Sequence, residues 1–156
     1  MKSKLLSTAV TYCLWLVVSG CAPQAVYLPV SLDVDEARKQ LIKGNNQING
    51  SILYEPDKGH AFAYPDTIVS CEGREVTLMP YTDFAREWAL KYYGAPVTNT
   101  AYRLANRGKA PNIMGSEQLF ALTRKTQCDE KGQFRFSDVS DGDYFLIAKV
   151  RWLGKD

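Results

Sequence analysis

The chain has 156 residues, of which 46% are hydrophobic, and 19 lysines and arginines face 17 aspartates and glutamates. Two of the lysines, Lys2 and Lys4, lie in the short basic start MKSK, and without them the basic residues also number 17. A near-neutral chain with no basic stripe interleaved with aromatic residues argues against nucleic acid as a partner.

The first predicted element is a secretory signal. Residues 5–18 form an apolar run of 14 residues, which is shorter than the roughly 20 that a membrane-spanning helix needs. A basic start, an apolar run and then small residues is the order of a signal peptide. Residues 18–21, VSGC, resemble a bacterial lipobox, where lipid is attached to the cysteine and the chain is cut before it. We expect residues 1–20 to be removed and Cys21 to carry the lipid, palmitate among its acyl chains.

The residue after Cys21 bears on the destination. Ala22 stands where an aspartate is associated with inner-membrane retention. We therefore expect an outer-membrane lipoprotein that faces the periplasm, with the inner membrane and the cell surface left open. A plain signal peptide or a short anchor is the alternative to a lipoprotein signal.

The four cysteines then reduce to one candidate pair. Cys13 leaves with the signal peptide and Cys21 is consumed by the lipid, which leaves Cys71 and Cys128. Two thiols in an oxidising compartment usually pair, so we expect a disulfide; two buried, unpaired thiols are the alternative. A metal site is disfavoured because there is no CxxC and the one histidine is His60.

The mature chain begins with a predicted tether and a short helix, together residues 21–46. Residues 23–31, PQAVYLPVS, are polar and proline-bearing, which suits a tether that lifts the domain off the membrane. Asp33 or Asp35 can cap a helix that ends at Gly44 and Asn45.

Residues 47–156 are predicted to form one domain of short strands. Residues 47–55 alternate apolar and polar side chains around Gly50, which suggests a close approach or a bulge. In residues 70–80, Val76 and Leu78 share one side of a strand and Thr77 and Met79 the other, and Pro80 ends it.

A helix interrupts the strands over about residues 81–93, with Phe84, Trp88 and Tyr92 at helical spacing and Gly94 as its C-cap. Phe84 and Trp88 are expected to dock the helix on the sheet. A basic loop follows, and residues 117–127 are expected to be a strand that leads into Cys128.

The last stretch predicts a hairpin. Phe134 and Phe136 alternate with polar residues, and Asp141-Gly142 supplies a turn. The returning strand places five residues on one face, which we expect to be core: Tyr144, Leu146, Ala148, Val150 and Trp152.

This hairpin resembles the closing hairpin of a carboxypeptidase regulatory-like domain, on Gly132, Phe134, Phe136, Gly142 and Tyr144. Residues 48–52 and 72–80 are similar to the first two strands of that family, so the resemblance runs from residue 48 to about 153. It implies a mainly β fold, an antiparallel transthyretin-like (prealbumin-like) β-sandwich with a short N-terminal helix and one inserted helix. It brings no catalytic residues, because the domain is non-catalytic where it accompanies the peptidase.

We therefore expect no enzyme and no cofactor, but a binding or scaffold module for an envelope protein or cell-wall glycan. The alternatives are a secretion-system accessory lipoprotein, an envelope hydrolase with a cleft by residues 81–115, and a structural spacer. Interface hot spots favour Trp, Tyr and Arg, and loops on a rigid scaffold carry binding. The candidate partner-binding residues are therefore Tyr92 and Tyr93 of the helix and Arg103, Arg107 and Lys109 of the basic loop. Inward packing of the two tyrosines and a solvated loop are the alternatives.

Three further groups have ordinary explanations. Asp138, Asp141 and Asp143 resemble a calcium loop, yet the glutamate that closes an EF-hand is missing, and a solvated turn is favoured. His60 could act as a catalytic base, but the sequence has no G-x-S-x-G motif to supply a nucleophile. Glu72 and Glu75 flank a strand, and sequence cannot show whether they share a cleft.

Overall fold

The computed structural model of the protein describes residues 24–54, 69–98, 100, 101, 103 and 108–150. Within these ranges the chain forms short strands and three helices, in the order β1 Ala25–Val26, α1 Val34–Gln40, β2 Asn46–Ser51, β3 Leu53–Tyr54, β4 Val69–Ser70, β5 Glu75–Pro80, α2 Asp83–Tyr93, β6 Asn112–Ile113, α3 Ser116–Ala121, β7 Arg124–Gln127, β8 Gln133–Val139 and β9 Tyr144–Ala148. No helix in the described ranges combines the length and the apolar character needed to cross a bilayer.

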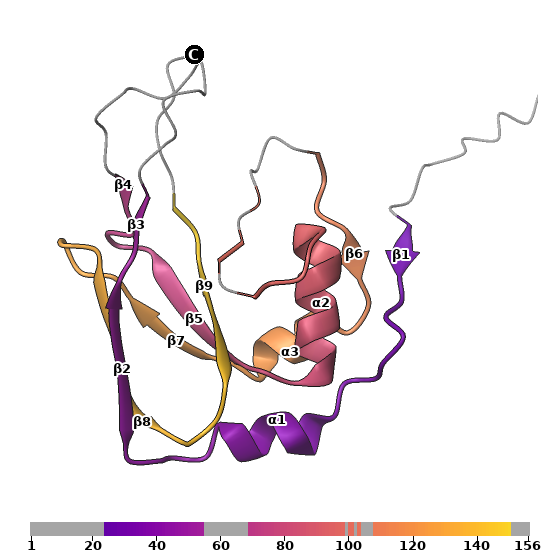
Figure 1. Ribbon diagram of the computed structural model, residues 1–156, viewed down its shortest axis with the longest axis horizontal. Helices are drawn as coiled ribbons and strands as arrows, with labels where there is room; N and C mark the ends of the chain where they lie inside the picture. The colour runs from indigo at the N-terminus through magenta and orange to yellow at the C-terminus, as the bar shows by residue number, and fades with distance from the viewer. Residues whose placement is uncertain (1–23, 55–68, 99, 102, 104–107, 151–156) are drawn as a thin grey trace, which may run out of the picture.

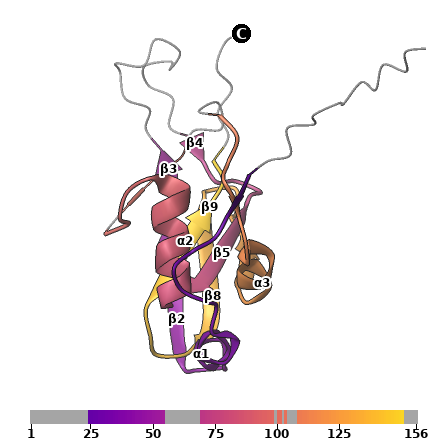
Figure 2. The same ribbon diagram turned by 90° about the vertical axis from the view of Figure 1, so that its right-hand side faces the viewer.

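These elements stack in three layers (Figures 1 and 2). An antiparallel β2–β8 pair forms the first, and the antiparallel sheet β7-β5-β9 forms the second. Helices α2 and α3 cover the far face of the second sheet. The predicted antiparallel β-sandwich is confirmed, and so are the N-terminal helix and the inserted helix.

Strand β5 joins the two cores because it is buried on both faces. Val76 and Leu78 pack between the two sheets, whereas Met79 packs against the helices, and all three are fully buried. This is the side-chain alternation that the sequence predicts. Burying an aliphatic side chain of this size contributes about 1.5–3 kcal/mol relative to leaving it exposed, so β5 is the strand on which both cores depend.

The predicted close approach at Gly50 is present. Gly50 lies opposite Phe134 in the β2–β8 pair, and a Cβ atom on it would fall 2.7 Å from the Phe134 ring. Phe134 and Phe136 both point into the core between the sheets, as their alternation predicts. The missing side chain at Gly50 therefore makes room for a core aromatic ring.

Helix α2 ends at the predicted residue and begins two residues later than predicted, at Asp83. The Thr82 hydroxyl accepts a hydrogen bond from the Ala85 amide at its start, and Gly94 closes its end in the left-handed conformation. Phe84 and Trp88 are 5% and 4% exposed and dock the helix on the sheet, which confirms their expected role.

The strand expected over residues 117–127 is wrong in its first half, where the chain forms α3 before β7. Leu119 is fully buried against α2, and the Ser116 hydroxyl accepts a hydrogen bond from the Trp88 indole at 3.0 Å while donating to the Ile113 carbonyl at 2.6 Å. The contacts with α2 come from residues distant in sequence. Such tertiary contacts override a short apolar run that fits either structure.

The expected tether is also revised. From residue 24 the chain packs on the helical layer: β1 pairs in parallel with β6, and Val26, Leu28, Val30 and Leu32 are partly buried there. We call residues 24–32 the N-terminal strap. It leads into α1, where Asp33 is the N-cap and its carboxylate accepts from the amides of Asp35 and Glu36.

One residue of the predicted β9 core face is misplaced. Tyr144 and Ala148 pack against the core between the sheets, but Leu146 is 45% exposed. Strand β9 is an edge strand of its sheet, so neighbours cover it from one side only. Val150 is partly buried, and Trp152 lies outside the described residues.

Tyr144 ties the closing hairpin to α1. Its hydroxyl donates to the Gln40 carbonyl at 2.7 Å and lies 2.8 Å from the Ser140 hydroxyl, which also bonds the Gln40 carbonyl. We expect Tyr144→Phe to lower the free energy of unfolding by about 1 kcal/mol, because it removes one hydrogen-bonding group from a partly buried network. Chemical denaturation measures this difference.

Tyr27→Phe is the matched control, because the Tyr27 side chain is 76% exposed and the same hydroxyl is removed. An exposed change of this kind is expected to stay within about 0.5 kcal/mol. Equal effects of the two substitutions would contradict a structural role for the Tyr144 hydroxyl.

Candidate functional site

A polar groove of about 690 Å³ lies where edge strand β7 of one sheet meets edge strand β8 of the other. Gly50 and Phe134 contribute to its wall. The remaining lining residues are polar and come from β2, β7, β8 and the turn between the last two: Asn49, Ser51, Thr126, Gln127, Asp129, Gln133 and Arg135.

The β2–β8 register explains this composition. Asn49 lies opposite Arg135, and Ser51 lies opposite Gln133. Successive residues of a strand point to opposite faces. Since Phe134 and Phe136 point into the core, their neighbours Gln133 and Arg135 are exposed on the outer face.

The turn between β7 and β8 holds the Asp129 carboxylate in place. Its Oδ1 atom accepts from the amides of Lys131 and Gln133, at 2.9 and 2.8 Å. Gly132 adopts a positive φ of 70°, which a residue without a Cβ atom adopts readily. The carboxylate is thus oriented by the backbone before any ligand arrives.

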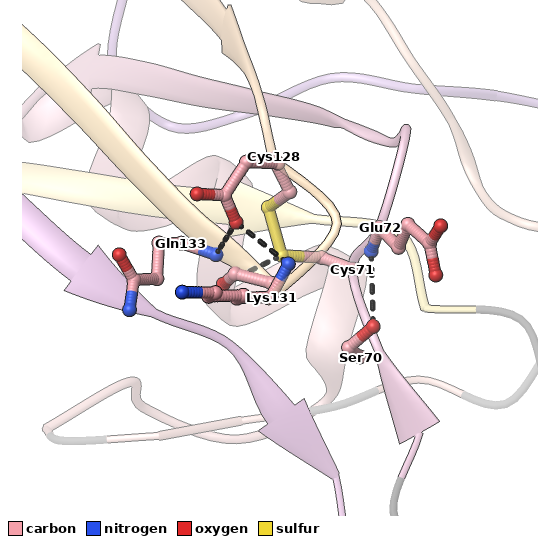
Figure 3. Close-up of a disulfide and its surroundings, with 8 residues drawn as sticks. Ser70, Cys71, Glu72, Cys128, Lys131 and Gln133 are labelled. Atoms are coloured by element: carbon pink, nitrogen blue, oxygen red, sulfur yellow. Dashed lines mark hydrogen bonds between the residues drawn. A yellow bond between two sulfur atoms is a disulfide. The ribbon is translucent and has the colours of Figure 1, made fainter.

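A disulfide anchors the same turn. Cys71 and Cys128 are joined as predicted, with Cα atoms 5.7 Å apart, and both side chains are buried between the sheets. Figure 3 shows this bond next to Lys131 and Gln133. Because Cys128 directly precedes Asp129, the cross-link fixes one wall of the groove.

The groove suits a ligand that is rich in hydroxyl, amide or carboxylate groups. Each Asn or Gln amide offers two N–H donors and one oxygen acceptor, and the Arg135 guanidinium can bind a carboxylate or paired oxygens with two parallel hydrogen bonds. One Arg135 N–H group donates to the Gln47 side-chain oxygen, which orients the guanidinium on the sheet.

The candidate binding residues that the sequence singles out lie elsewhere. Tyr92 and Tyr93 are partly buried beside Trp88, with ring centroids 4.8 and 6.4 Å from its ring. Burial, and then the neighbouring Tyr92, raise the pKa of Tyr93, so this phenol stays neutral at neutral pH. Both tyrosines mainly pack α2 on the domain.

The basic loop is only partly described. The Arg103 guanidinium lies 5.6 Å from the centre of the Tyr92 ring and donates to the carbonyls of Gly108 and Lys109. These contacts hold the loop against α2. Lys109 is exposed, and Arg107 lies outside the described residues. The structure therefore brings Arg103 to Tyr92 but gathers no basic cluster in the part that it describes.

A second pocket, of about 430 Å³, lies between the N-terminal strap and α2. Its lining residues are Tyr27, Leu28, Pro29, Glu87, Leu90, Lys91 and Gly94. Glu87 is the one carboxylate among them, and it lies 3.5 Å from Arg86. A hydrolase cleft at this place would need a second acid or base, and the candidate base His60 lies outside the described residues.

Among the described residues, Glu75 and Asp141, unlike Glu72, have structural partners for their carboxylates. Glu75 lies 3.0 Å from the Lys125 ammonium, and Glu72 is exposed beside the disulfide. Asp141 accepts a hydrogen bond from the Asn46 amide at 2.8 Å. Across the described ranges, no three or more His, Cys, Asp or Glu side chains gather as a metal site would require.

Sequence reasoning missed the groove residues. In the sequence, the polar residues that alternate with Phe134 and Phe136 indicate only the solvent-facing side of a strand. Asn49 and Ser51 likewise indicate only the polar side of the first strand. The feature of the sequence that could have indicated the groove is the kind of side chain: the exposed sides of the two strands carry amides, hydroxyls and a single arginine. Their pairing depends on register, which only the structure gives.

The chain shares its fold with a solved protein. No protein-family model and no curated protein matches it. A crystal structure of a protein from Pseudomonas aeruginosa described as a "putative carbohydrate binding protein" superposes with a TM-score of 0.55 at 17% sequence identity. The match covers 83% of this chain and 79% of that one, so the two proteins share an overall fold.

Proposed function

We propose that the protein is a lipid-anchored, periplasm-facing lipoprotein that binds glycan of the cell envelope in the β7–β8 groove without chemical conversion of it. The lipobox at residues 18–21 supports the anchor and the compartment. The single observation that carries the binding role is the polar lining of the groove, where amides and hydroxyls surround one oriented carboxylate and one arginine.

The chemistry of a cell-wall glycan fits this lining. Such a polymer presents hydroxyl, acetamido and carboxylate groups, which pair with amides, with Asp129 and with Arg135, respectively. The groove volume of about 690 Å³ falls in the usual range of about 300–1,000 Å³ for ligand sites. The fold shared with a protein described as carbohydrate binding is a second, independent support.

The sandwich itself is proposed to be a carboxypeptidase regulatory-like domain. Four of the five residues that carry the resemblance have a structural role that fits it. Gly132 turns the chain into β8, Phe134 and Phe136 fill the core, and Tyr144 bonds the end of α1. A domain with this scaffold binds through its loops and sheet faces, in agreement with a non-catalytic module.

The test is binding of the purified protein to isolated cell-wall glycan by co-sedimentation. Asp129→Asn keeps the Oδ1 acceptor that the turn needs but removes the charge, and Arg135→Gln removes the fork of donors. Each is expected to weaken binding about ten- to a hundredfold, since hydrogen bonds to charged groups contribute about 1.5–3 kcal/mol.

Arg38→Gln is the matched control for Arg135→Gln. Arg38 is an exposed arginine on α1, paired only with Asp35 at 3.7 Å in the described part of the chain. The Arg38→Gln variant should bind glycan as strongly as the wild type does. If the wild type does not sediment with glycan, or if the control loses as much as the groove variants, the proposed site is wrong.

A further inference from the structure

The position of the N-terminal strap constrains how an anchored domain can face its membrane. The strap is part of the fold, because the Met114 amide donates to the Val26 carbonyl at 2.9 Å and four strap side chains pack on the helical layer. The first described residue, Gln24, is three positions after Cys21. Three residues span at most about 11 Å, so lipid on Cys21 would bring the strap close to the headgroups.

The strap lies on one outer face of the three layers. Figure 1 shows β1 and the strap on the far side of α2 from the β2–β8 pair. Figure 2 views the molecule from the strap side, with the strap in front of the helical layer. The polar groove belongs to β2, β7 and β8, and so it lies on the other side of the central sheet from the strap.

The strap face also exposes apolar side chains. Strap residues alternate, so that Val26 and Leu28 point inward while Tyr27 is 76% exposed. Leu90 of α2, which is 37% exposed, lines the same pocket as Tyr27, and Met114 beside β1 is 44% exposed. We call Tyr27, Leu90 and Met114 the strap patch.

The chemistry of this patch suits the surface of a bilayer. Tyrosine is enriched at membrane–water interfaces, where its ring is apolar and its hydroxyl is hydrated. Lys91, which lines the pocket with Tyr27 and Leu90, can rest its methylene chain on apolar surface and extend its ammonium toward phosphate. The strap patch is therefore suited to contact a lipid surface. Lipid on Cys21 would hold such a surface close to the patch, because only a short segment separates Cys21 from the strap.

We propose that the strap patch rests on the lipid headgroups and that the polar groove consequently faces away from the anchoring membrane. This inference depends on the proposed lipid anchor at Cys21. It extends the proposed function, because a groove that faces outward can reach glycan that lies beyond the membrane surface.

The test uses the lipidated full chain in vesicles. Tyr27→Cys places a thiol on the patch, and Ser51→Cys places one on the outer face of β2; both sites are exposed. With Cys71 and Cys128 in a disulfide and Cys21 acylated, the new thiol is the one that accepts a fluorophore. The vesicles contain phosphatidylethanolamine and phosphatidylglycerol with nitroxide-labelled headgroups as quencher.

The label at position 27 is expected to lose most of its emission, and the label at position 51 little. A helix diameter and a sheet spacing, each about 10 Å, separate the two faces. Equal quenching at both sites, stronger quenching at position 51, or no quenching at position 27 of an acylated protein would overturn the orientation. Intact mass is measured first: a chain without acyl groups would refute the anchor itself, and the orientation with it.

Discussion

Replacing both Cys71 and Cys128 by alanine is expected to lower the free energy of unfolding by about 4 kcal/mol. The disulfide closes a separation of 57 residues, and in the chain-entropy model a loop of that length is worth about this much. For a chain of this size the loss corresponds to a fall in melting temperature of about 12 °C. Thermal denaturation under non-oxidising and oxidising conditions measures it.

Reduced wild-type protein is the control for this experiment. It lacks the cross-link but keeps both sulfur atoms, so its difference from the double variant reports only the loss of buried volume. The two should melt at similar temperatures, both well below the oxidised wild type. A double variant that melts with the oxidised wild type would refute the disulfide as a source of stability.

The second large effect is expected at Cys21. Cys21→Ser should move the protein from the membrane fraction to the soluble fraction, because a serine hydroxyl cannot form the thioether that attaches the lipid. Fractionation, combined with intact mass of the purified protein, measures the change. The expected mass of the wild-type product is that of a chain beginning at an acylated Cys21.

Cys13→Ser is the matched control, because it removes a thiol within the predicted signal peptide and leaves the lipobox intact. This variant should remain in the membrane fraction. Retention of Cys21→Ser in that fraction would contradict the lipid anchor, and the compartment would then need another explanation.

Much of the fold follows from local pattern. The alternation of residues 76–79 places β5 between two cores, and the helical spacing of Phe84 and Trp88, with Gly94 beyond, places α2. The disulfide follows from counting thiols. In each case the signal lies within one element or in composition, where sequence is most informative.

What could not be predicted depends on contacts between distant segments. β1 and β6 are two-residue strands that pair with each other and lie on the helical layer. α3 forms where Leu119 meets α2, and Leu146 is exposed because β9 lies at an edge. The groove likewise exists only once β7 and β8 meet, so its residues are unremarkable along the chain.

The most direct test of glycan binding in the β7–β8 groove is an NMR titration of the isotope-labelled protein with soluble cell-wall glycan fragments. We expect the backbone amide signals of Asn49, Gln127, Gln133 and Arg135 to shift together and saturate. The side-chain amide signals of the asparagine and the two glutamines should shift with them, while signals of α2 and the strap stay in place. Shifts confined to the pocket of Tyr27, Leu90 and Lys91, or no shifts at all, would contradict glycan binding in the β7–β8 groove.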